Sequence, residues 1–219
     1  MKKTTRDLVA LLALTLVTSC FVGGTFAKYV TSIEEAADNA RVAKWGVSGT
    51  VTGGAFATSY EAHDGETELD ITVESSTEDK LVAPGTNGTF TGVSLTGTPE
   101  VAVKITKTAT VTINDKWIDE EGAFYCPIVV TINGTPISGL ECTDANDFAG
   151  KIKAAIELGS GEYEPNTNLA TITNMNGNYT WAWAFDGDNV SDTYLGDQAA
   201  LGNAGTIAIA ASAIVEQID

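Results

Sequence analysis

The stretch VAVKITKTATVTI, residues 101–113, is the longest alternating run in this sequence. Apolar residues occupy its odd positions, except at Lys107, and polar residues occupy the even positions from Lys104 onward. A period of two predicts a β-strand with one buried side and one side facing water. Lys107 interrupts the apolar side, which predicts a β-bulge there.

Shorter alternating runs occur at 69–74, 124–132, 179–185 and 207–218. The last run is apolar on both parities, which predicts a second bulge. Turn signals separate these runs: Pro84-Gly85 favours a type II turn, and Asn133-Gly134 favours a two-residue hairpin turn. Many short strands separated by turns predict an all-β antiparallel sandwich of jelly-roll type.

One segment has the pattern of an amphipathic helix. Thr143-Asp144 predicts its N-cap, and Gly159 predicts its end near Leu158. The apolar residues of this segment share one side: Phe148, Ile152, Ala155 and Ile156. The expected fold class is therefore an all-β sandwich with one or two short helices.

The first 27 residues have the features of an export signal. A basic start is followed by an uncharged run from Leu8 to Ala27. The run ends with small residues, Thr25 and Ala27, at the two positions that a signal peptidase reads, so cleavage is expected before Lys28. Two alternatives remain open. The run is about long enough for an uncleaved membrane anchor, and Cys20 loosely fits a lipoprotein cleavage site.

The residues after the signal predict a weakly structured arm followed by a single domain. Residues 28–44 carry few large apolar side chains and no clear alternation, so the domain is expected to begin at Trp45. Ser32 and Glu35 fit a capping box, which favours a short helix in the arm. We expect a signal peptide at 1–27, an N-terminal arm at 28–44 and one β-sandwich domain at 45–219.

The chain is strongly acidic. Its formal net charge is -17, and residues 1–27 contribute +2 (Lys2, Lys3 and Arg6 against Asp7), which leaves -19 for the remainder. This charge argues against nucleic acid and anionic membrane surfaces as partners. We expect membrane contact only before cleavage, and a location in the extracellular matrix or at the cell surface.

No catalytic constellation is visible in the sequence. A zinc peptidase commonly uses two histidines at helical spacing, but this chain contains one histidine, His63. We therefore expect no enzyme activity and no required cofactor. Asp186, Asp188 and Asp192 are weak Ca²⁺ candidates, since they lack the closing glutamate of an EF-hand. A solvated turn between two strands is the simpler interpretation of this loop.

Two cysteines follow the signal, Cys126 and Cys142, and an exported chain permits a disulfide between them. If the hairpin turn at Asn133-Gly134 continues in register, Cys126 faces Glu141 and Cys142 lies on the opposite side. The pattern leaves their pairing open.

Four aromatic residues share one side of the run at 179–185: Tyr179, Trp181, Trp183 and Phe185. Aromatic residues of this size favour a core position, because they bury the largest area. If Trp181 and Trp183 were exposed, the same side would suit a carbohydrate ligand.

Several stretches resemble the TasA/camelysin family, exported proteins of Gram-positive bacteria that a dedicated signal peptidase cuts and that form extracellular matrix fibres. These stretches are GGTFAKY (23–29), ARVAKWGV (40–47), LVAPGTNGTF (81–90), YCPIVVTINGTPI (125–137), WAWAF (181–185), DTYLG (192–196) and VEQID (215–219). The resemblance implies a jelly-roll sandwich and assembly by donor-strand exchange. It also implies a protease as an alternative, because camelysins carry that annotation.

Together these features predict a secreted structural subunit of a biofilm-matrix or cell-surface fibre that forms a homopolymer. After a signal peptidase has cut the precursor, the arm would add a strand to the next copy, with Val30, Ile33 and Val42 facing the acceptor. Such head-to-tail contacts propagate as a filament. The alternatives are a camelysin-type secreted metalloendopeptidase and a monomeric carbohydrate-binding sandwich.

Overall fold

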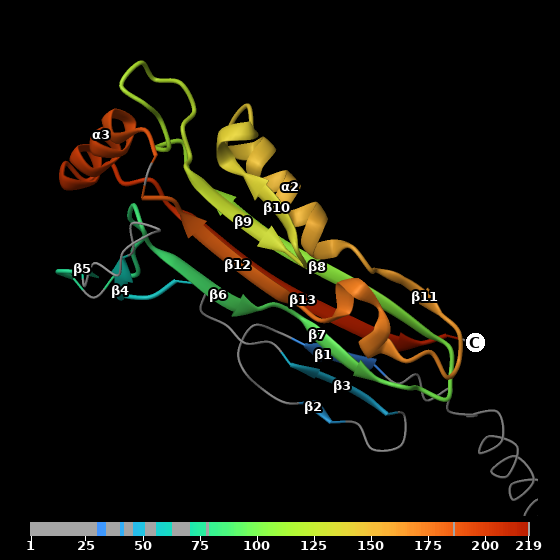
Figure 1. Ribbon diagram of the computed structural model, residues 1–219. Helices are drawn as coiled ribbons and strands as arrows, with labels where there is room; N and C mark the ends of the chain where they lie inside the picture. The colour runs from blue at the N-terminus through green and yellow to red at the C-terminus, as the bar shows by residue number, and fades with distance from the viewer. Residues whose placement is uncertain are drawn as a thin grey trace, which may run out of the picture.

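The computed structural model describes residues 30–33, 40–41, 46–50, 56–62, 71–77, 79–185 and 187–218. In this part of the chain, two four-stranded antiparallel sheets form a sandwich, accompanied by a smaller sheet, a hairpin and two α-helices (Figure 1). The expected all-β sandwich with short helices is confirmed. No helix in these ranges is long and apolar enough to cross a membrane.

The first sheet has the strand order β1-β13-β8-β11 and the second has the order β10-β9-β12-β6. The strands of the first sheet are β1 (Val30–Ile33), β13 (Ile207–Gln217), β8 (Val103–Ile113) and β11 (Gly161–Tyr163). Those of the second are β10 (Thr135–Ser138), β9 (Ile128–Ile132), β12 (Asn178–Trp183) and β6 (Asn87–Thr91).

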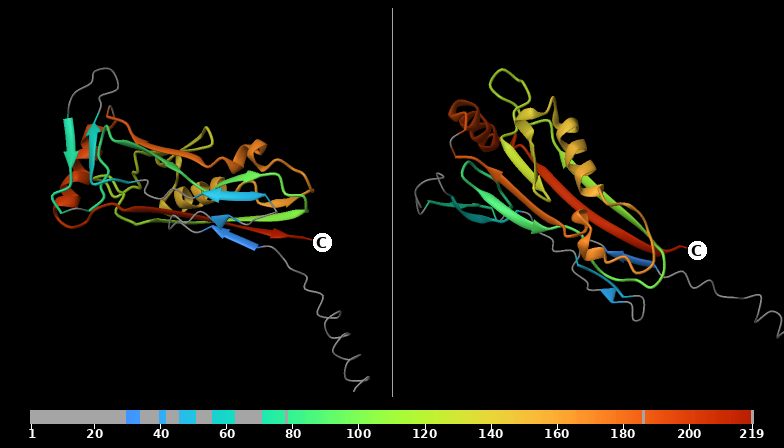
Figure 2. Two further views of the ribbon diagram at one scale, coloured as in Figure 1. Left: turned by 90° about the horizontal axis from the view of Figure 1, so that it is seen from below. Right: turned by 45° about the vertical axis from the view of Figure 1, so that its right-hand side comes forward.

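The smaller elements complete the described fold. The three-stranded sheet consists of β2 (Ala40–Arg41), β3 (Val47–Thr50) and β7 (Ser94–Gly97), and the hairpin consists of β4 (Ser59–Ala62) and β5 (Ile71–Glu74). The helices are α2 (Ala145–Glu157) and α3 (Asn189–Ala200), with short 3-10 turns η1 (Gly139–Glu141), η2 (Leu169–Thr171) and η3 (Thr173–Met175). The C-terminal end of β13 and α3 lie at opposite ends of the sandwich (Figure 1, Figure 2).

The central strands β8 and β13 pair without interruption over eleven residues, from Ile207↔Ile113 to Gln217↔Val103. The two predicted bulges are therefore wrong. Lys107 keeps its place on the buried side because its Nζ donates to two backbone carbonyl oxygens, those of Leu158 at 3.0 Å and Asn174 at 2.7 Å.

The core lies between the two sheets, and β12 supplies its largest side chains. Tyr179, Trp181 and Trp183 are at most 5% exposed, whereas Phe185, beyond the end of the strand, is 40% exposed. Gly92 lacks a side chain because the Tyr179 ring takes that space: an added Cβ would lie 1.7 Å from its Cε2. The carbohydrate-binding alternative required Trp181 and Trp183 to be exposed, and both are buried.

Local sequence signals place several elements correctly. Asp144 caps α2 by accepting hydrogen bonds from two backbone N–H groups, and Gly159 follows the helix with φ +89°. The Pro84-Gly85 turn closes with a hydrogen bond from Thr86 N to Ala83 O at 3.0 Å, and Gly85 has the positive φ of a type II turn. The two-residue hairpin turn at Asn133-Gly134 joins β9 to β10.

Candidate functional site

The edge of the first sheet contains part of the N-terminal arm. β1 pairs antiparallel with β13, from Val30↔Glu216 to Ile33↔Ala213, and β2 pairs with β3. The expectation that the arm contacts the domain only from Trp45 onward is therefore wrong. The predicted helix start at Ser32 is also wrong, since Ser32 lies inside β1.

The hydrogen bonds beside β8 show which way its backbone groups point. The N–H groups of Lys107 and Ala109 donate to Ser160 Oγ at 2.9 Å and to Glu157 Oε1 at 3.0 Å. Both acceptors lie on the side of β8 away from β13. Because backbone polar groups alternate between the two sides of a strand, the even-numbered residues of β8 bond to β13.

Two hydrogen bonds beyond the strand ends agree with this assignment. Asn114 N donates to Thr206 O at 3.2 Å, and Ile218 N donates to Ala102 O at 3.0 Å, so even-numbered residues bond across the pair. The odd-numbered residues of β13 therefore direct their N–H and C=O groups to the opposite edge, where β1 lies over residues 213–216.

The two outer edges of the β8–β13 pair differ. The edge of β8 is covered by β11 at residues 103–105 and by the hydrogen bonds of Ser160 and Glu157. On β13, β1 covers only 213–216, and within the described ranges no strand pairs with residues 207–212 on that side. An uncovered strand edge is a template for another strand.

Five predicted site residues lie outside the described residues: Thr25, Ala27, Lys28, Val42 and Asp186. The single histidine, His63, lies outside them as well. Val30 and Ile33 are described as backbone positions at the two ends of β1. The structure therefore describes the strand β1 that the arm contributes to the first sheet. The cleavage site stays a prediction.

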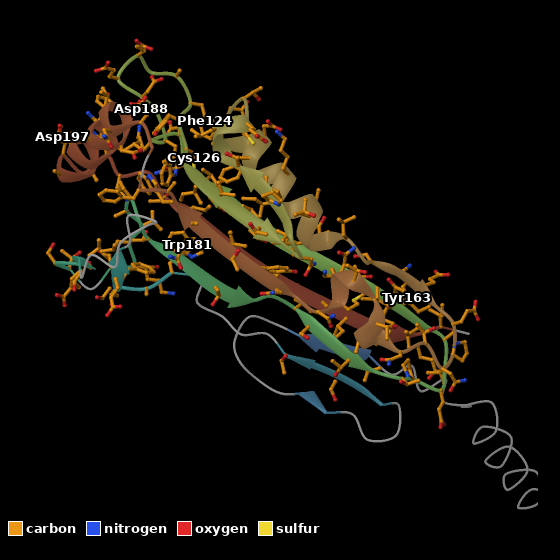
Figure 3. All side chains as sticks on the ribbon, viewed as in Figure 1. Phe124, Cys126, Tyr163, Trp181, Asp188 and Asp197 are labelled. Atoms are coloured by element: carbon orange, nitrogen blue, oxygen red, sulfur yellow. The ribbon has the colours of Figure 1, made fainter. Side chains whose placement is uncertain are left out.

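The acidic loop leads into a helix, and the predicted turn between two strands is wrong. Asp188 is the N-cap of α3: its Oδ2 accepts from Ser191 Oγ at 2.9 Å and its Oδ1 from Val190 N at 3.1 Å. The hydrogen bond from the Ser191 side chain, followed by those from the backbone, holds the pKa of Asp188 below its ordinary value. Figure 3 shows Asp188 beside α3, toward the end of the molecule opposite Tyr163.

Asp192 fastens α3 to the second sheet. It is buried, and its two carboxylate oxygens accept from Tyr125 Oη at 2.8 Å and from Trp183 Nε1 at 3.3 Å. Burial, and then the hydrogen bond to Asp192, raise the pKa of Tyr125 well above its usual range. Among the described residues, no cluster of three or more His, Cys, Asp or Glu side chains could hold a metal ion. The described Ca²⁺ candidates therefore act here as a cap and as an anchor.

The two cysteines are free thiols in the structure. Cys126 is buried against Gly139, where an added Cβ would lie 3.1 Å from its Sγ, and burial raises its pKa to about 12. The β9–β10 pairing ends at Ser138, so the extended register expected to Glu141 is wrong.

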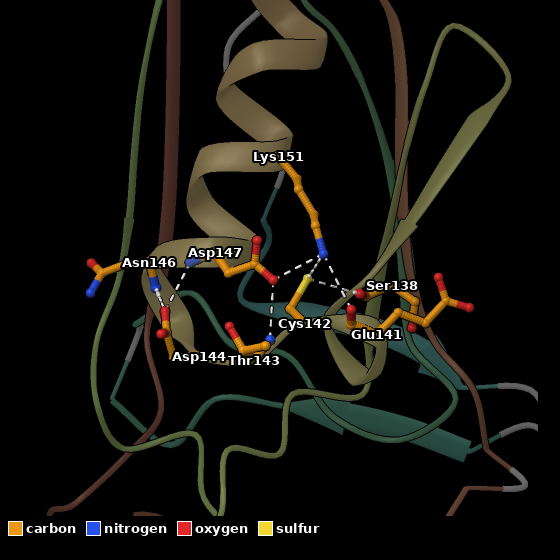
Figure 4. A network of polar contacts seen from close by, with 8 residues as sticks. All are labelled: Ser138, Glu141, Cys142, Thr143, Asp144, Asn146, Asp147 and Lys151. Atoms are coloured by element: carbon orange, nitrogen blue, oxygen red, sulfur yellow. Dashed lines mark hydrogen bonds and ion pairs between the residues drawn. The ribbon is translucent and has the colours of Figure 1, made fainter.

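Cys142 belongs to a polar network at the start of α2 (Figure 4). Its Sγ donates to Ser138 O at 3.3 Å and lies 3.4 Å from Lys151 Nζ, which also pairs with Asp147 Oδ2 at 2.9 Å. Burial raises the pKa of the Cys142 thiol, and the Lys151 ammonium partly opposes that effect. This network holds Cys142 as a thiol at the α2 terminus.

The sequence interpretation missed α3, although its signals were present. Asp188 is a favourable N-cap residue, and Gly202 follows the helix with φ +82°. The cavity beside α3, described below, was missed as well, because its lining residues come from six separate stretches of the chain.

Comparison with known proteins leaves the family assignment open. No family model, no curated protein and no solved structure matches this chain. The resemblance to the TasA/camelysin family therefore stays a prediction that rests on the quoted stretches alone.

Proposed function

We propose that this chain is a secreted structural subunit of an extracellular matrix or cell-surface fibre, and that copies polymerise by exchanging β1. The observation that supports this proposal is the position of β1. It is a four-residue edge strand near the N-terminus, and β13 is its partner in the first sheet. Because β1 pairs only with β13 within its sheet, it can leave the sheet while β13, β8 and β11 stay paired.

The same edge of β13 accepts β1 from another copy with the same register and the same backbone hydrogen bonds. Exchange of an identical element is domain swapping, which has a low energetic cost because the hydrogen bonds to the new copy replace identical ones within the old. A contact that joins the N-terminal strand of one copy to β13 of the next is heterologous, and it propagates as a filament when the rotation between successive copies does not close a ring.

Within the described ranges, residues 207–212 of β13 pair with no strand on this edge, which favours addition of a longer strand than β1 alone. Backbone groups of Ile207, Ile209 and Ala211 point to this edge, and strand addition would pair them. Cleavage of the signal would release the N-terminal end of the arm and thereby make exchange between copies possible. No observation in the described part of the chain favours the metallopeptidase alternative.

Proline scanning of β1 tests this proposal. Thr31 lies opposite Val215, an odd-numbered residue whose backbone groups face β1, whereas Ser32 lies opposite Ile214, whose groups face β8. Thr31→Pro removes an N–H that bonds to the acceptor, a loss of about 0.5–1.5 kcal/mol. Ser32→Pro is the matched control, because its N–H points away from the ladder and edge strands tolerate such prolines.

We expect Thr31→Pro to give a folded protein that stays monomeric in sedimentation, and Ser32→Pro to form filaments visible by electron microscopy. The near-ultraviolet circular dichroism of the tryptophans reports folding in both variants. Filaments formed equally well by the two variants would refute exchange of β1.

A further inference from the structure

A cavity of about 810 Å³ opens beside α3. Its walls are the segment 79–84, one side of α3 and residues 204–209, which lead into β13. Most of the side chains around it are apolar, including Phe56, Val82, Pro84, Trp117, Trp183 and Leu195. Pockets of about 300–1,000 Å³ with mainly apolar walls commonly bind small organic ligands.

The two tryptophans of this pocket are held in fixed orientations. Trp117 Nε1 donates to Thr206 O at 3.1 Å, and Trp183 Nε1 donates to Asp192 Oδ2 at 3.3 Å. Their ring centroids lie 5.8 Å apart at an interplanar angle of 57°. Gly205 packs on the Trp117 ring so closely that an added Cβ would lie 2.7 Å from it. Both indole N–H groups are used inside the protein, and the two rings, which are 2% and 5% exposed, form the buried apolar base of the pocket.

The charged groups that line the pocket differ in their availability. The Asp192 oxygens accept the two hydrogen bonds described above, and Asp79 Oδ2 accepts from Thr77 Oγ1 at 2.8 Å. Lys80 is exposed and has no hydrogen bond or ion pair with the described residues. Lys80 thus places a positive charge next to the apolar walls.

We propose that this pocket binds an amphipathic organic anion. The apolar body of the ligand packs against the partly exposed side chains of Phe56, Val82 and Pro84, and its acid group meets the Lys80 ammonium. Rigid walls favour this binding, because little side-chain freedom is lost when the ligand enters. No residue of β1 lines the pocket, whereas Ile207 and Ile209 belong both to its wall and to the β13 edge at residues 207–212.

Titration of the full chain with decanoate, a straight-chain fatty-acid anion, tests the proposal, with tryptophan fluorescence and calorimetry as readouts. Gly196→Leu blocks the pocket: Gly196 lines it, and an added Cβ there meets nothing within 4 Å. Gly150→Leu on α2 is the matched control, because its Cβ is equally unobstructed and lies outside the pocket.

We expect saturable binding of decanoate that Gly196→Leu weakens by about tenfold or more, the usual cost of overfilling a packed site, while Gly150→Leu leaves it unchanged. Absence of saturable binding, or equal binding by both variants, would overturn the proposed site.

Lys80→Gln tests the charged end of the ligand, with Lys116→Gln as the control at another exposed lysine. Loss of one solvent-exposed ion pair should weaken decanoate about two- to fivefold and leave its neutral counterpart, decanol, unaffected. Equal losses for decanoate and decanol, or no loss for either, would show that the site does not recognise an anion.

Discussion

Lys107 is a buried ammonium on the core side of β8. Its Nζ donates to the carbonyl of Leu158, the C-cap residue of α2, and a positive charge is favourable at a helix C-terminus. Burial nevertheless lowers the pKa of Lys107 from 10.5 to about 8. Between these two values the folded chain binds fewer protons than the unfolded chain, so the free energy of unfolding rises with pH across this window.

We predict that Lys107→Met removes this pH dependence. Between pH 8 and pH 10.5, the free energy of unfolding of the wild type should rise by about 1–3 kcal/mol relative to that of the variant. Urea denaturation at both ends of the window measures the difference. Lys104→Met, at an exposed position of the same strand, should keep the wild-type slope. A Lys107→Met slope equal to that of the wild type would contradict the assigned pKa.

The helix α3 depends on one buried carboxylate for its position. Asp192 accepts hydrogen bonds from Trp183 on β12 and from Tyr125, so one side chain joins the helix to the preceding strand and to a segment 67 residues away. The hydrophobic pattern of α3 is weak, since Val190 in its first turn and Leu201, its C-cap residue, are exposed apolar side chains. The hydrogen bonds of Asp192 therefore hold α3 against the sheet, whereas α2 is held by the buried apolar residues along one of its sides.

We predict that Asp192→Ala destabilises the protein by about 2–4 kcal/mol, because it leaves two buried donors without an acceptor. The near-ultraviolet circular dichroism of the tryptophans should change as well, since Trp183 loses its partner. Asp197→Ala, at an exposed position of the same helix, is the control and should remain within about 0.5 kcal/mol of the wild type. Equal melting temperatures for the two variants would refute the anchoring role.

Elements with a complete local signal were predictable from the sequence. The alternation of β8, the Asp144 cap of α2 and the turn at Pro84-Gly85 each depend on residues within a few positions of one another. The burial of Lys107 was not predictable, because its two carbonyl partners lie far along the chain. A core-facing lysine without visible partners suggested a bulge instead.

The candidate assembly edge depends on long-range pairing and was predicted only in part. The arm was identified by its lack of pattern, but its pairing with β13 joins the two ends of the chain. The alternation of a four-residue strand is too short to predict a partner. Asp192 was noted as a possible oxygen ligand, whereas its role as an anchor follows from Trp183 and Tyr125, which approach it only in the fold.

The whole molecule is elongated along β8 and β13, with α3 at one end and the C-terminal end of β13 near the other (Figure 1, Figure 2). β1 pairs with that C-terminal part of β13. Along this edge of β13, the residues that pair with β1 (213–216) are thus followed by residues 207–212, which pair with no strand of the described ranges on that side. This arrangement suits a filament in which each copy donates β1 at one contact and receives β1 at the next.

Disulfide trapping across the β1–β13 pair tests this account most directly. Ser32 lies opposite Ile214, a non-hydrogen-bonded pair by the alternation described above, whose Cα atoms are typically about 4.5 Å apart. That separation permits a disulfide. The test protein carries Ser32→Cys and Ile214→Cys in a Cys142→Ser background. The control replaces Ile214→Cys with Ala208→Cys, which is out of register with Ser32.

Exchange of β1 predicts that oxidised filaments of the test protein give a ladder of covalent oligomers on a denaturing gel. The same protein oxidised as a monomer should give only internally bridged chains, and the control should give no ladder. Normal filaments that yield only internally bridged monomers after oxidation would show that each β1 remains on its own sheet, and would contradict the proposed assembly.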